Sequence, residues 1–240
     1  MIIIGDIHGK TYDLIAKIEK YDLQNEILVL LGDCGVGFSH VPEYMDRWSD
    51  FNDFLGKRSI MIYIVRGNHD NPRYFDGKSD YTNIIFVPDY SVINIGDKNI
   101  LFLGGAISID RSVRLNNRSY WKNEGFVFKP EIVKNIKNVD IVVSHTCPNF
   151  AEPISFSSEV DYWHNFEKGM PGNSEINLKE ELTKERKDLT YIYNMLKHTN
   201  KPKNNIAHWF YSHFHFSGRQ VYEGVNFVLL DIDEWYDFKN

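Results

Sequence analysis

Cysteine is scarce in this chain of 240 residues, which carries only Cys34 and Cys147. Two cysteines are too few for the disulfide framework that stabilises many secreted domains, so the composition favours a reducing compartment. We interpret both as small buried residues, with soft metal ligands or redox-sensitive thiols as the alternatives.

Long apolar runs are also missing. No stretch approaches the roughly 18 apolar residues that a membrane-spanning helix needs. The chain begins Met-Ile-Ile-Ile-Gly-Asp, which carries no basic segment and has an apolar run too short for a signal peptide. We therefore expect a cytoplasmic protein without a membrane partner.

The sequence has no excess of basic residues, because 27 Lys and Arg stand against 33 Asp and Glu, a formal net charge of −6. This balance gives no general attraction to phosphate backbones, which disfavours nucleic acid as a partner. The apolar fraction of 42% is sufficient for a large core, and the length suits a single domain spanning 1–240. The oligomeric state stays open.

The first part of the chain alternates between short apolar runs and amphipathic segments. Apolar runs at 2–4, 27–31 and 60–65 predict buried strands, and the spacing of apolar residues predicts helices over 10–21 and 43–57. This alternation is typical of right-handed β-α-β units and predicts an α/β fold with a buried sheet.

The remainder of the chain is less regular. Short strands at 84–87, 91–95 and 100–103 suggest an antiparallel meander. Further along we predict a strand at 139–144, a helix over 176–198, a strand at 206–211 and a closing hairpin of 219–222 with 225–230. The span 146–205 begins with an irregular segment, 146–173, and is the best candidate for an insertion or cap.

Polar clusters follow five of the apolar runs. They are Gly5-Asp6-Ile7-His8-Gly9, Gly32-Asp33, Gly67-Asn68-His69-Asp70, His145 and Ser212-His213-Phe214-His215. The carboxyl ends of strands in α/β sheets share one edge, where ligands bind, so we expect these clusters to converge. Asp, His and Asn side chains are ligands for divalent metal ions. The sequence therefore predicts a metal site at this edge.

At these residues the chain resembles the calcineurin-like metallophosphoesterase superfamily. The pattern of that family runs Asp-x-His, Gly-Asp, Gly-Asn-His-Asp/Glu, a lone His and Gly-His-x-His. All five pieces occur here in this order between residues 5 and 215. One piece alone is weak evidence, whereas five in order after predicted strands are specific. The resemblance implies an α/β fold built as a four-layer α/β/β/α sandwich of mixed sheets with flanking helices.

The resemblance also implies two divalent metal ions held side by side. One ion would be bound by Asp6, His8, Asp33 and His215, and the other by Asp33, Asn68, His145 and His213, with Asp33 bridging. A metal-bridging hydroxide would attack phosphorus while the ions hold the phosphoryl oxygens. His69 would protonate the leaving oxygen as the general acid. Manganese is the favoured metal, and iron, zinc, nickel and cobalt are alternatives.

Two departures from the family pattern bear on the function. The protein phosphatase branch continues Gly-Asp-x-x-Asp-Arg-Gly, whereas this chain reads Gly-Asp-Cys-Gly-Val-Gly over residues 32–37. It therefore lacks the Arg that would hold the substrate phosphate, and Val36 replaces the Asp that would orient the general acid. Asp70 is a candidate replacement for this Asp and, with His69, a candidate catalytic residue. Ser212 opens the last motif in place of Gly and should be tolerated because it is small.

Three arginines, Arg111, Arg114 and Arg118, follow a Gly-Gly turn after a predicted strand. Such a loop can hold phosphate through bidentate guanidinium contacts, so Arg111 and Arg114 are candidate substrate-binding residues together with Asn68. A solvated charged loop is the alternative interpretation.

The predicted insertion offers two further interpretations. Four of its aromatic residues either line a substrate pocket under a cap or, more simply, pack within the insertion; they are Phe156, Tyr162, Trp163 and Phe166. The charged residues of the helix over 176–198 predict its solvated face; they include Glu180, Glu181, Lys184, Glu185, Arg186 and Lys187.

The motifs favour a hydrolase that cleaves a phosphomonoester or phosphodiester of small or intermediate size, nucleotides included. Ser/Thr protein phosphatase-like activity is one alternative, weakened by the missing Asp-Arg pair. A non-catalytic binding scaffold with the same fold is another, although a scaffold needs neither a complete ligand set nor His69. The sequence leaves open the substrate, the choice between monoester and diester, and the physiological metal.

Overall fold

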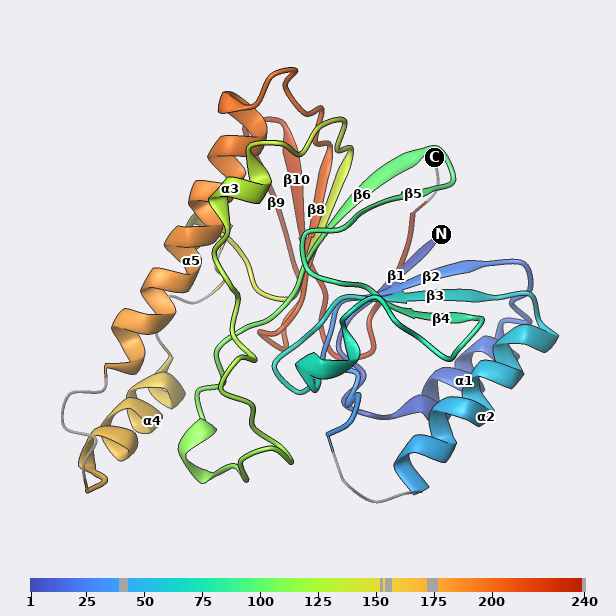
Figure 1. Cartoon of the computed structure of the whole chain (residues 1–240), viewed down its shortest axis with the longest axis horizontal. Coiled ribbons are helices and arrows are strands. Elements are labelled where there is room, and N and C mark those ends of the chain that lie inside the picture. The colour runs from blue at the N-terminus through green and yellow to red at the C-terminus, as the bar shows by residue number, and fades with distance from the viewer. Residues whose placement is uncertain (39–42, 152, 154–156, 172–176, 239–240) are drawn as a thin grey trace.

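The structure is a computed structural model that describes residues 1–38, 43–151, 153, 157–171 and 177–238. Two mixed sheets lie face to face, and helices cover their outer sides (Figure 1). The chain ends in a strand that pairs with its first strand, so the N- and C-terminal strands are neighbours in one sheet.

The first sheet has five strands in the order β11-β1-β2-β3-β4. They are β1 (Ile2–Ile4), β2 (Ile27–Leu30), β3 (Met61–Ile64), β4 (Ile84–Phe86) and β11 (Trp235–Asp237). The first four pair in parallel, and β11 is antiparallel to β1. The three predicted N-terminal strands are present, and β11 is a strand that the sequence analysis does not predict.

The second sheet has six strands in the order β5-β6-β7-β8-β10-β9. They are β5 (Val92–Ile95), β6 (Lys98–Leu103), β7 (Ile141–Ser144), β8 (His208–Tyr211), β9 (Gly218–Tyr222) and β10 (Val225–Leu229). The meander predicted over 84–103 is wrong at its first strand, because β4 pairs in parallel with β3 and only β5 and β6 form an antiparallel pair. The chain changes sheets between β4 and β5.

Helices complete the outer layers. α1 (Thr11–Lys20) and α2 (Glu43–Lys57) cover the first sheet, and α5 (Leu178–Asn194) covers the second (Figure 1). The shorter elements are α3 (Pro130–Val133), α4 (Ser158–Gly169), the 3₁₀ turns η1 (Pro72–Tyr74), η2 (Arg111–Val113) and η3 (Asn149–Ala151), and the π-helical η4 (Met195–Thr199). The α/β/β/α order of layers confirms the expected fold.

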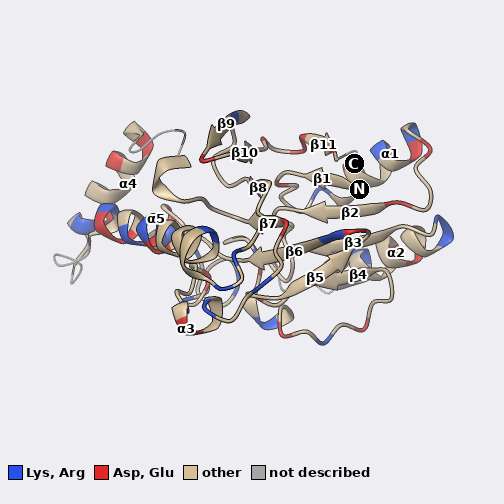
Figure 2. Ribbon diagram, turned by 90° about the horizontal axis from the view of Figure 1, so that it is seen from above, with Lys and Arg blue, Asp and Glu red and all other residues tan. Residues whose placement is uncertain are grey.

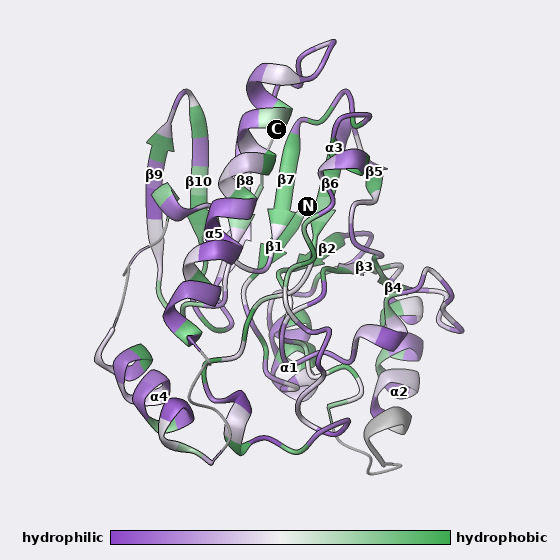
Figure 3. Cartoon of the chain, turned by 60° about the vertical axis from the view of Figure 1, so that its left-hand side comes forward, coloured by the Kyte–Doolittle hydropathy of each residue, from purple (hydrophilic) through white to green (hydrophobic). Residues whose placement is uncertain are grey.

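Alternating side chains of the strands build three apolar layers. In β2, Val29 packs between the two sheets, whereas Leu28 and Leu30 pack toward α1 and α2. On the far side, Leu189 and Ile192 of α5 pack on the second sheet. The hydropathy colouring shows apolar β6 and β7 beside α5, whose visible side is largely polar (Figure 3).

The helical part of the predicted insertion differs from the expectation. α4 lies in the segment predicted to be irregular, and its N-terminus is capped by the Ser157 hydroxyl, which accepts a hydrogen bond from Val160 N at 3.2 Å. α5 begins at Leu178 and changes into a π-helical turn after Asn194. Basic and acidic residues alternate along the ribbons of α4 and α5 (Figure 2).

The prediction of a solvated charged face on α5 is wrong for two residues. Glu185 and Arg186 are only 4% and 5% exposed, whereas Lys184 and Lys187 are exposed as expected. Charged residues are seldom buried this deeply, so the contacts of Glu185 and Arg186 lie within the protein and not with solvent. Along the described stretches, none of the helices combines the length and apolar character that crossing a bilayer demands.

Candidate metal centre

The polar clusters that follow β1, β2, β3, β7 and β8 lie together in the structure. These strands belong to different sheets, yet His145 Nε2 lies 3.3 Å from Asp33 Oδ1, and Ser212 Oγ lies 2.5 Å from Asp6 Oδ1. Both sheets therefore end at one common site, as the strand-end argument expects.

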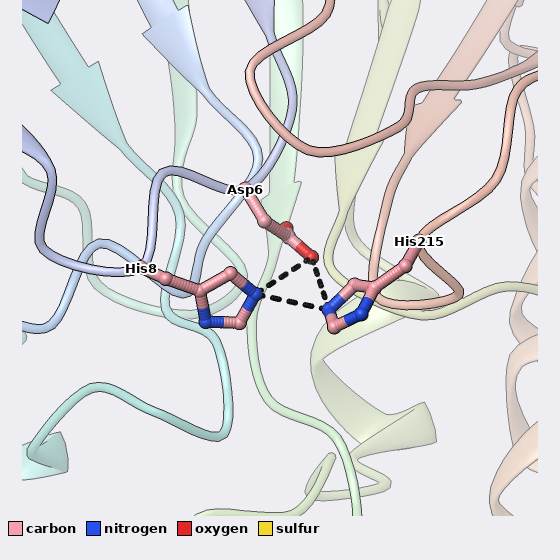
Figure 4. A group of neighbouring side chains, drawn as sticks. All are labelled: Asp6, His8 and His215. Carbon is pink, nitrogen blue, oxygen red and sulfur yellow. Dashed lines mark hydrogen bonds and ion pairs between the residues drawn. The ribbon is translucent and has the colours of Figure 1, made fainter. Parts of the chain in front are cut away.

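Asp6, His8 and His215 form the first candidate ligand group. The Nε2 atoms of His8 and His215 lie 2.9 Å apart, and Asp6 Oδ2 lies 4.0 Å and 3.6 Å from them, respectively (Figure 4). One carboxylate oxygen and two imidazole nitrogens thus point at a shared space, which is a donor set that a divalent transition metal ion prefers.

Asp33, His145 and His213 form a second group, and His8, Asp33 and His69 form a third. In each group the ligand atoms lie within 4.8 Å of one another. Asn68 joins the second group, because its Oδ1 lies 3.0 Å from His145 Nε2. Asp33 is shared by two groups and lies between them, which is the position that a bridging carboxylate would occupy.

The backbone is strained at four of the predicted ligands. Their φ angles are positive: 44° at His8, 49° at Asp33, 74° at His213 and 49° at His215. Residues other than glycine seldom adopt this left-handed region, and such strain is concentrated at functional sites. The backbone of Gly32 lies close to the His145 ring, because a Cβ at this position would lie 2.6 Å from His145 Nδ1.

Hydrogen bonds behind the ligands fix which atoms face the site. Leu31 O lies 2.7 Å from His145 Nδ1 and accepts its proton, so that a neutral His145 would turn the lone pair of Nε2 toward Asp33 and Asn68. The Asn68 Nδ2 group donates to Ser108 Oγ at 3.0 Å, so its carbonyl oxygen faces inward. Asp6 accepts from Ser212 Oγ at 2.5 Å and from His213 N at 3.2 Å.

The buried charges of the site are strongly coupled. Burial alone would lower the pKa of His145, but the Asp33 and Asp6 carboxylates outweigh it and raise that pKa to about 10. Burial would likewise raise the pKa of Asp33, but the His145 and His69 imidazoles hold it well below its usual range. Burial raises the pKa of Asp6 to about 7 and lowers the pKa of His8 to about 4.

These residues fit the divalent ions that the resemblance implies. His145 Nε2 and Asn68 Oδ1 converge at 3.0 Å, although both present lone pairs when His145 is neutral. A cation between these acceptors would remove the repulsion, and the raised pKa of His145 shows the same demand for positive charge. Burial first, then the His145 imidazole, lowers the pKa of His213, which keeps its imidazole neutral as a ligand must be.

His69, the predicted general acid, lies at the rim of the centre. Its Nε2 lies 3.8 Å from Asp33 Oδ2 and 2.6 Å from Arg114 Nη2. Burial first, and the Arg114 guanidinium among the nearby charges, lower the pKa of His69. The imidazole also stacks on Phe38, with ring centroids 5.0 Å apart.

Arg114 connects several of these groups. Besides its contact with His69, it donates to Ser108 Oγ at 2.9 Å and forms an ion pair with Asp110 at 2.6 Å. Ser108 in turn bonds Asn68, so Arg114 is linked to a predicted metal ligand through one hydroxyl. The structure therefore brings Arg114 to the site that the sequence predicts for it.

Two other predicted site residues have different surroundings. Asp70 is fully buried, and its oxygens accept hydrogen bonds from Val36 N at 2.9 Å and Gly67 N at 2.8 Å. It thus holds two loop backbones, and these contacts do not orient the His69 ring. Arg111 pairs with Glu167 at 2.8 Å and Glu181 at 2.6 Å, away from the pocket, so its contacts do not support a substrate-binding role.

A pocket of about 400 Å³ opens in front of the centre. Asn68, His69, Arg114, His213 and His215 line it together with Asp33 and Phe214, and further lining comes from the loop after β6, from Pro153 and Ser157, and from α4 and α5. Arg186, which lines this pocket from α5, is not among the predicted site residues. The sequence marks Arg186 only as one of the charged residues of the predicted helix over 176–198, next to Lys187, and this gives no sign of a place in the pocket.

The structure places one of the predicted aromatic residues in the pocket and both cysteines in the core. Trp163 lines the pocket, whereas Tyr162 and Phe166 are exposed on α4, and Phe156 falls outside the described residues. Cys34 and Cys147 are both buried, which agrees with the interpretation as small core residues. Burial raises the pKa of the Cys34 thiol, which makes it a poor nucleophile.

A profile of the calcineurin-like phosphoesterase family matches residues 1–223, and the chain belongs to this family. Comparison with curated proteins found no match. The chain is similar to the solved structure of a phosphopantetheinyl hydrolase from Mycobacterium tuberculosis (13% identity, TM-score 0.42, 96% of this chain and 89% of that chain). It is also similar to a dimetal phosphatase from Danio rerio (12% identity, TM-score 0.48, 97% and 87%).

The family and the ligand groups together support a metal-dependent hydrolase that acts on phosphoester bonds. The family implies divalent metal ions, and His and Asp groups suited to bind them are present at the strand ends.

Proposed function

We propose that this protein hydrolyses a small phosphomonoester or phosphodiester with two divalent metal ions, manganese being the favoured metal. The observation that carries the proposal is the convergence of three candidate ligand groups that share Asp33 and His8 at the base of one pocket. Bound ions would neutralise the phosphoryl oxygens and lower the pKa of the attacking water.

The ligand assignment follows the two sides of Asp33. Asp6, His8 and His215 would hold one ion, and Asn68, His145 and His213 the other, with Asp33 contributing to both. The hydrogen bonds from Ser212 to Asp6 and between Leu31 O and His145 keep these donors oriented before an ion binds. This preorganisation reduces the reorganisation that binding would otherwise require.

Arg114 and His69 would act on the substrate itself. The Arg114 guanidinium, with Ser108 and Asn68 beside it, can donate hydrogen bonds to phosphoryl oxygens, and so supplies the arginine that residues 32–37 lack. His69 would give its proton to the leaving oxygen. Its contact with Arg114 Nη2 means that phosphoryl binding must draw the guanidinium away from Nε2 before His69 can act as an acid.

The size of the pocket supports a small organic phosphate, nucleotides included, as the substrate class. About 400 Å³ falls within the range of pockets that hold small molecules. The walls that α4 and α5 add to the site leave less room for a folded phosphoprotein, which disfavours the protein phosphatase alternative.

The test is metal-dependent turnover of an aryl phosphate. Protein treated with a chelator should be inactive, and Mn²⁺ should restore hydrolysis of 4-nitrophenyl phosphate. Asp33→Asn should weaken binding of both ions in a calorimetric titration, because the amide has lost the shared charge. Asp13→Asn, an exposed change on α1, serves as the matched control. Turnover that persists without metal would contradict the proposal, and loss of only one ion in Asp33→Asn would contradict the bridging role.

A further inference from the structure

Arg186 is the one arginine that α5 contributes to the pocket lining. It is only 5% exposed, and its guanidinium lies over the Phe214 ring, 5.3 Å from the centroid. Phe214 separates the predicted ligands His213 and His215 in the sequence. Arg186 therefore lies beside the segment that carries His213 and His215, whereas Arg114 contacts His69 and Ser108.

The surroundings of Arg186 are partly apolar. Val160 and Trp163 of α4 line the same pocket, as do Ile109 and Phe214. Among the described residues, the acidic groups of the lining outside the metal ligands are Asp110, which pairs with Arg114 at 2.6 Å, and Glu159, which is exposed. The buried Glu185, next to Arg186 in α5, also feels its charge. The lining thus combines apolar side chains with two guanidinium groups, those of Arg114 and Arg186.

We propose that Arg186 determines substrate specificity by binding a second anionic group, a carboxylate or phosphate, in the organic part of the substrate. The inference rests on the proposed function, in which Arg114 and the metal ions hold the scissile phosphoryl group. An apolar ring or chain between the two anions would pack against Trp163 and Phe214. A guanidinium suits this task, because it binds both oxygens of a carboxylate or phosphate at once.

The test compares three non-hydrolysable probes on Mn²⁺-loaded protein by calorimetry: phenylphosphonate, 3-carboxyphenylphosphonate and 4-carboxyphenylphosphonate. All three present the same phosphonate to the metal centre. Two of them add a carboxylate, which lies at a different distance from the phosphonate in each. At least one carboxylated probe should bind the unmodified protein about tenfold more tightly than phenylphosphonate, as expected for one charge-assisted hydrogen-bonded contact.

Variants at Arg186 assign this preference to its guanidinium. Arg186→Met keeps an unbranched side chain against Phe214 and should reduce the affinity ratio to about one. Arg186→Lys keeps the charge without the planar fork and should retain part of the ratio. Lys187→Ala, at the exposed neighbouring position, should leave the ratio unchanged. Thermal unfolding of each variant shows whether it folds. If Arg186→Met does not fold, Arg186→Lys still tests the inference.

The possible outcomes separate the inference from the proposed function. Equal affinities of all three probes for the unmodified protein would overturn the inference, and so would an undiminished ratio in folded Arg186→Met or Arg186→Lys. An equal loss for every probe would place Arg186 on the scissile phosphoryl group and also overturn it. If the loaded protein binds no phosphonate and hydrolyses no aryl phosphate, the proposed function fails and the inference fails with it.

Discussion

Ser212 stands where the family pattern has glycine, and its hydroxyl lies 2.5 Å from Asp6 Oδ1 and 2.9 Å from Leu31 O. One hydroxyl hydrogen can serve only one acceptor, and the carboxylate is the closer and charged one. Asp6 is buried, and this hydrogen bond offsets part of the burial that raises its pKa. Ser212 is therefore more than a tolerated small residue, because it favours the ionised carboxylate that a metal ion requires.

Ser212→Ala should lower the affinity of the protein for Mn²⁺ by roughly 10- to 100-fold, the usual cost of losing a partner behind a metal ligand. A calorimetric titration measures the effect, with Ser158→Ala, an exposed change at the start of α4, as the control. Unchanged affinity would show that His213 N alone suffices to hold Asp6.

His69 can be tested through the leaving group of the substrate. A general acid matters most when the leaving oxygen is strongly basic, and general acids contribute on the order of 100-fold or more to the rate. His69→Asn should therefore lower kcat about 100-fold on an alkyl phosphate and far less on 4-nitrophenyl phosphate. Equal losses on both substrates would instead assign His69 to metal or phosphoryl binding, which its place in the third ligand group also permits.

The sequence predicts residue types at this site better than it predicts their partners. Asp6, His145 and the other candidate ligands could be named because Asp, His and Asn follow predicted strands in the family order. The partners of Arg111 could not be predicted, because Glu167 and Glu181 lie 56 and 70 residues further along the chain. The bonds from Asp70 to Val36 N and Gly67 N are unpredictable for the same reason, since they depend on how two loops pack.

Among the elements, the loop after β6 is the one that carries Ser108 and Arg114 to the pocket. Arg66, two residues after the end of β3, holds this loop. Its guanidinium donates to the carbonyl oxygens of Glu124, Gly104 and Gly125, and pairs with Asp89 at 2.8 Å. The strands themselves were predictable from buried apolar runs, but this anchoring is not, because it joins segments about 60 residues apart.

Gly105→Ala tests the importance of this anchoring. Gly105 has φ 94°, and a Cβ there would lie 2.6 Å from Arg66 Nη2 and from two backbone carbonyl oxygens. Because backbone must shift, we expect a loss of roughly 2–4 kcal/mol in the free energy of unfolding, together with a lower kcat as Arg114 moves. Urea denaturation and kinetics on 4-nitrophenyl phosphate measure the two effects.

Two glycines with positive φ provide the control for Gly105→Ala. Gly96 and Gly224 have φ 64° and 78°, and a Cβ at either position meets no atom within 4 Å. Gly96→Ala and Gly224→Ala should therefore cost only about 1 kcal/mol, the strain of the left-handed backbone. A Gly105→Ala variant no less stable than these controls would show that the loop tolerates displacement from Arg66.

At the scale of the whole molecule, two buried glutamate side chains can ionise only at a cost in the free energy of folding. Burial raises the pKa of both Glu124 and Glu185 from 4.5 to about 7. Glu124 accepts hydrogen bonds from Ser108 N and Trp121 N, and Glu185 accepts from Phe126 N, so both carboxyl groups hold the segment between β6 and α3. Among the described residues, Glu185 Oε2 has no hydrogen-bond partner.

These raised pKa values set the sign of a pH dependence. Between pH 4.5 and about 7 the folded chain binds protons that the unfolded chain releases, so stability falls as pH rises. The stabilising contribution of each protonated group is complete below about pH 4.5 and is lost as pH rises through about 7. The loss for a group as buried as Glu185 is on the order of 3 kcal/mol.

Glu185→Gln should isolate this effect, because the amide stays neutral at every pH. The difference in unfolding free energy, unmodified protein minus variant, should decrease by on the order of 3 kcal/mol between pH 5 and pH 8 in urea denaturation of the metal-free protein. The metal ligands titrate in both proteins and cancel in this difference. Glu180→Gln, at an exposed position of α5, should show almost no such trend. Parallel pH profiles for Glu185→Gln and the unmodified protein would mean that Glu185 stays charged inside the fold, held by the neighbouring Arg186 guanidinium, which favours its ionised form.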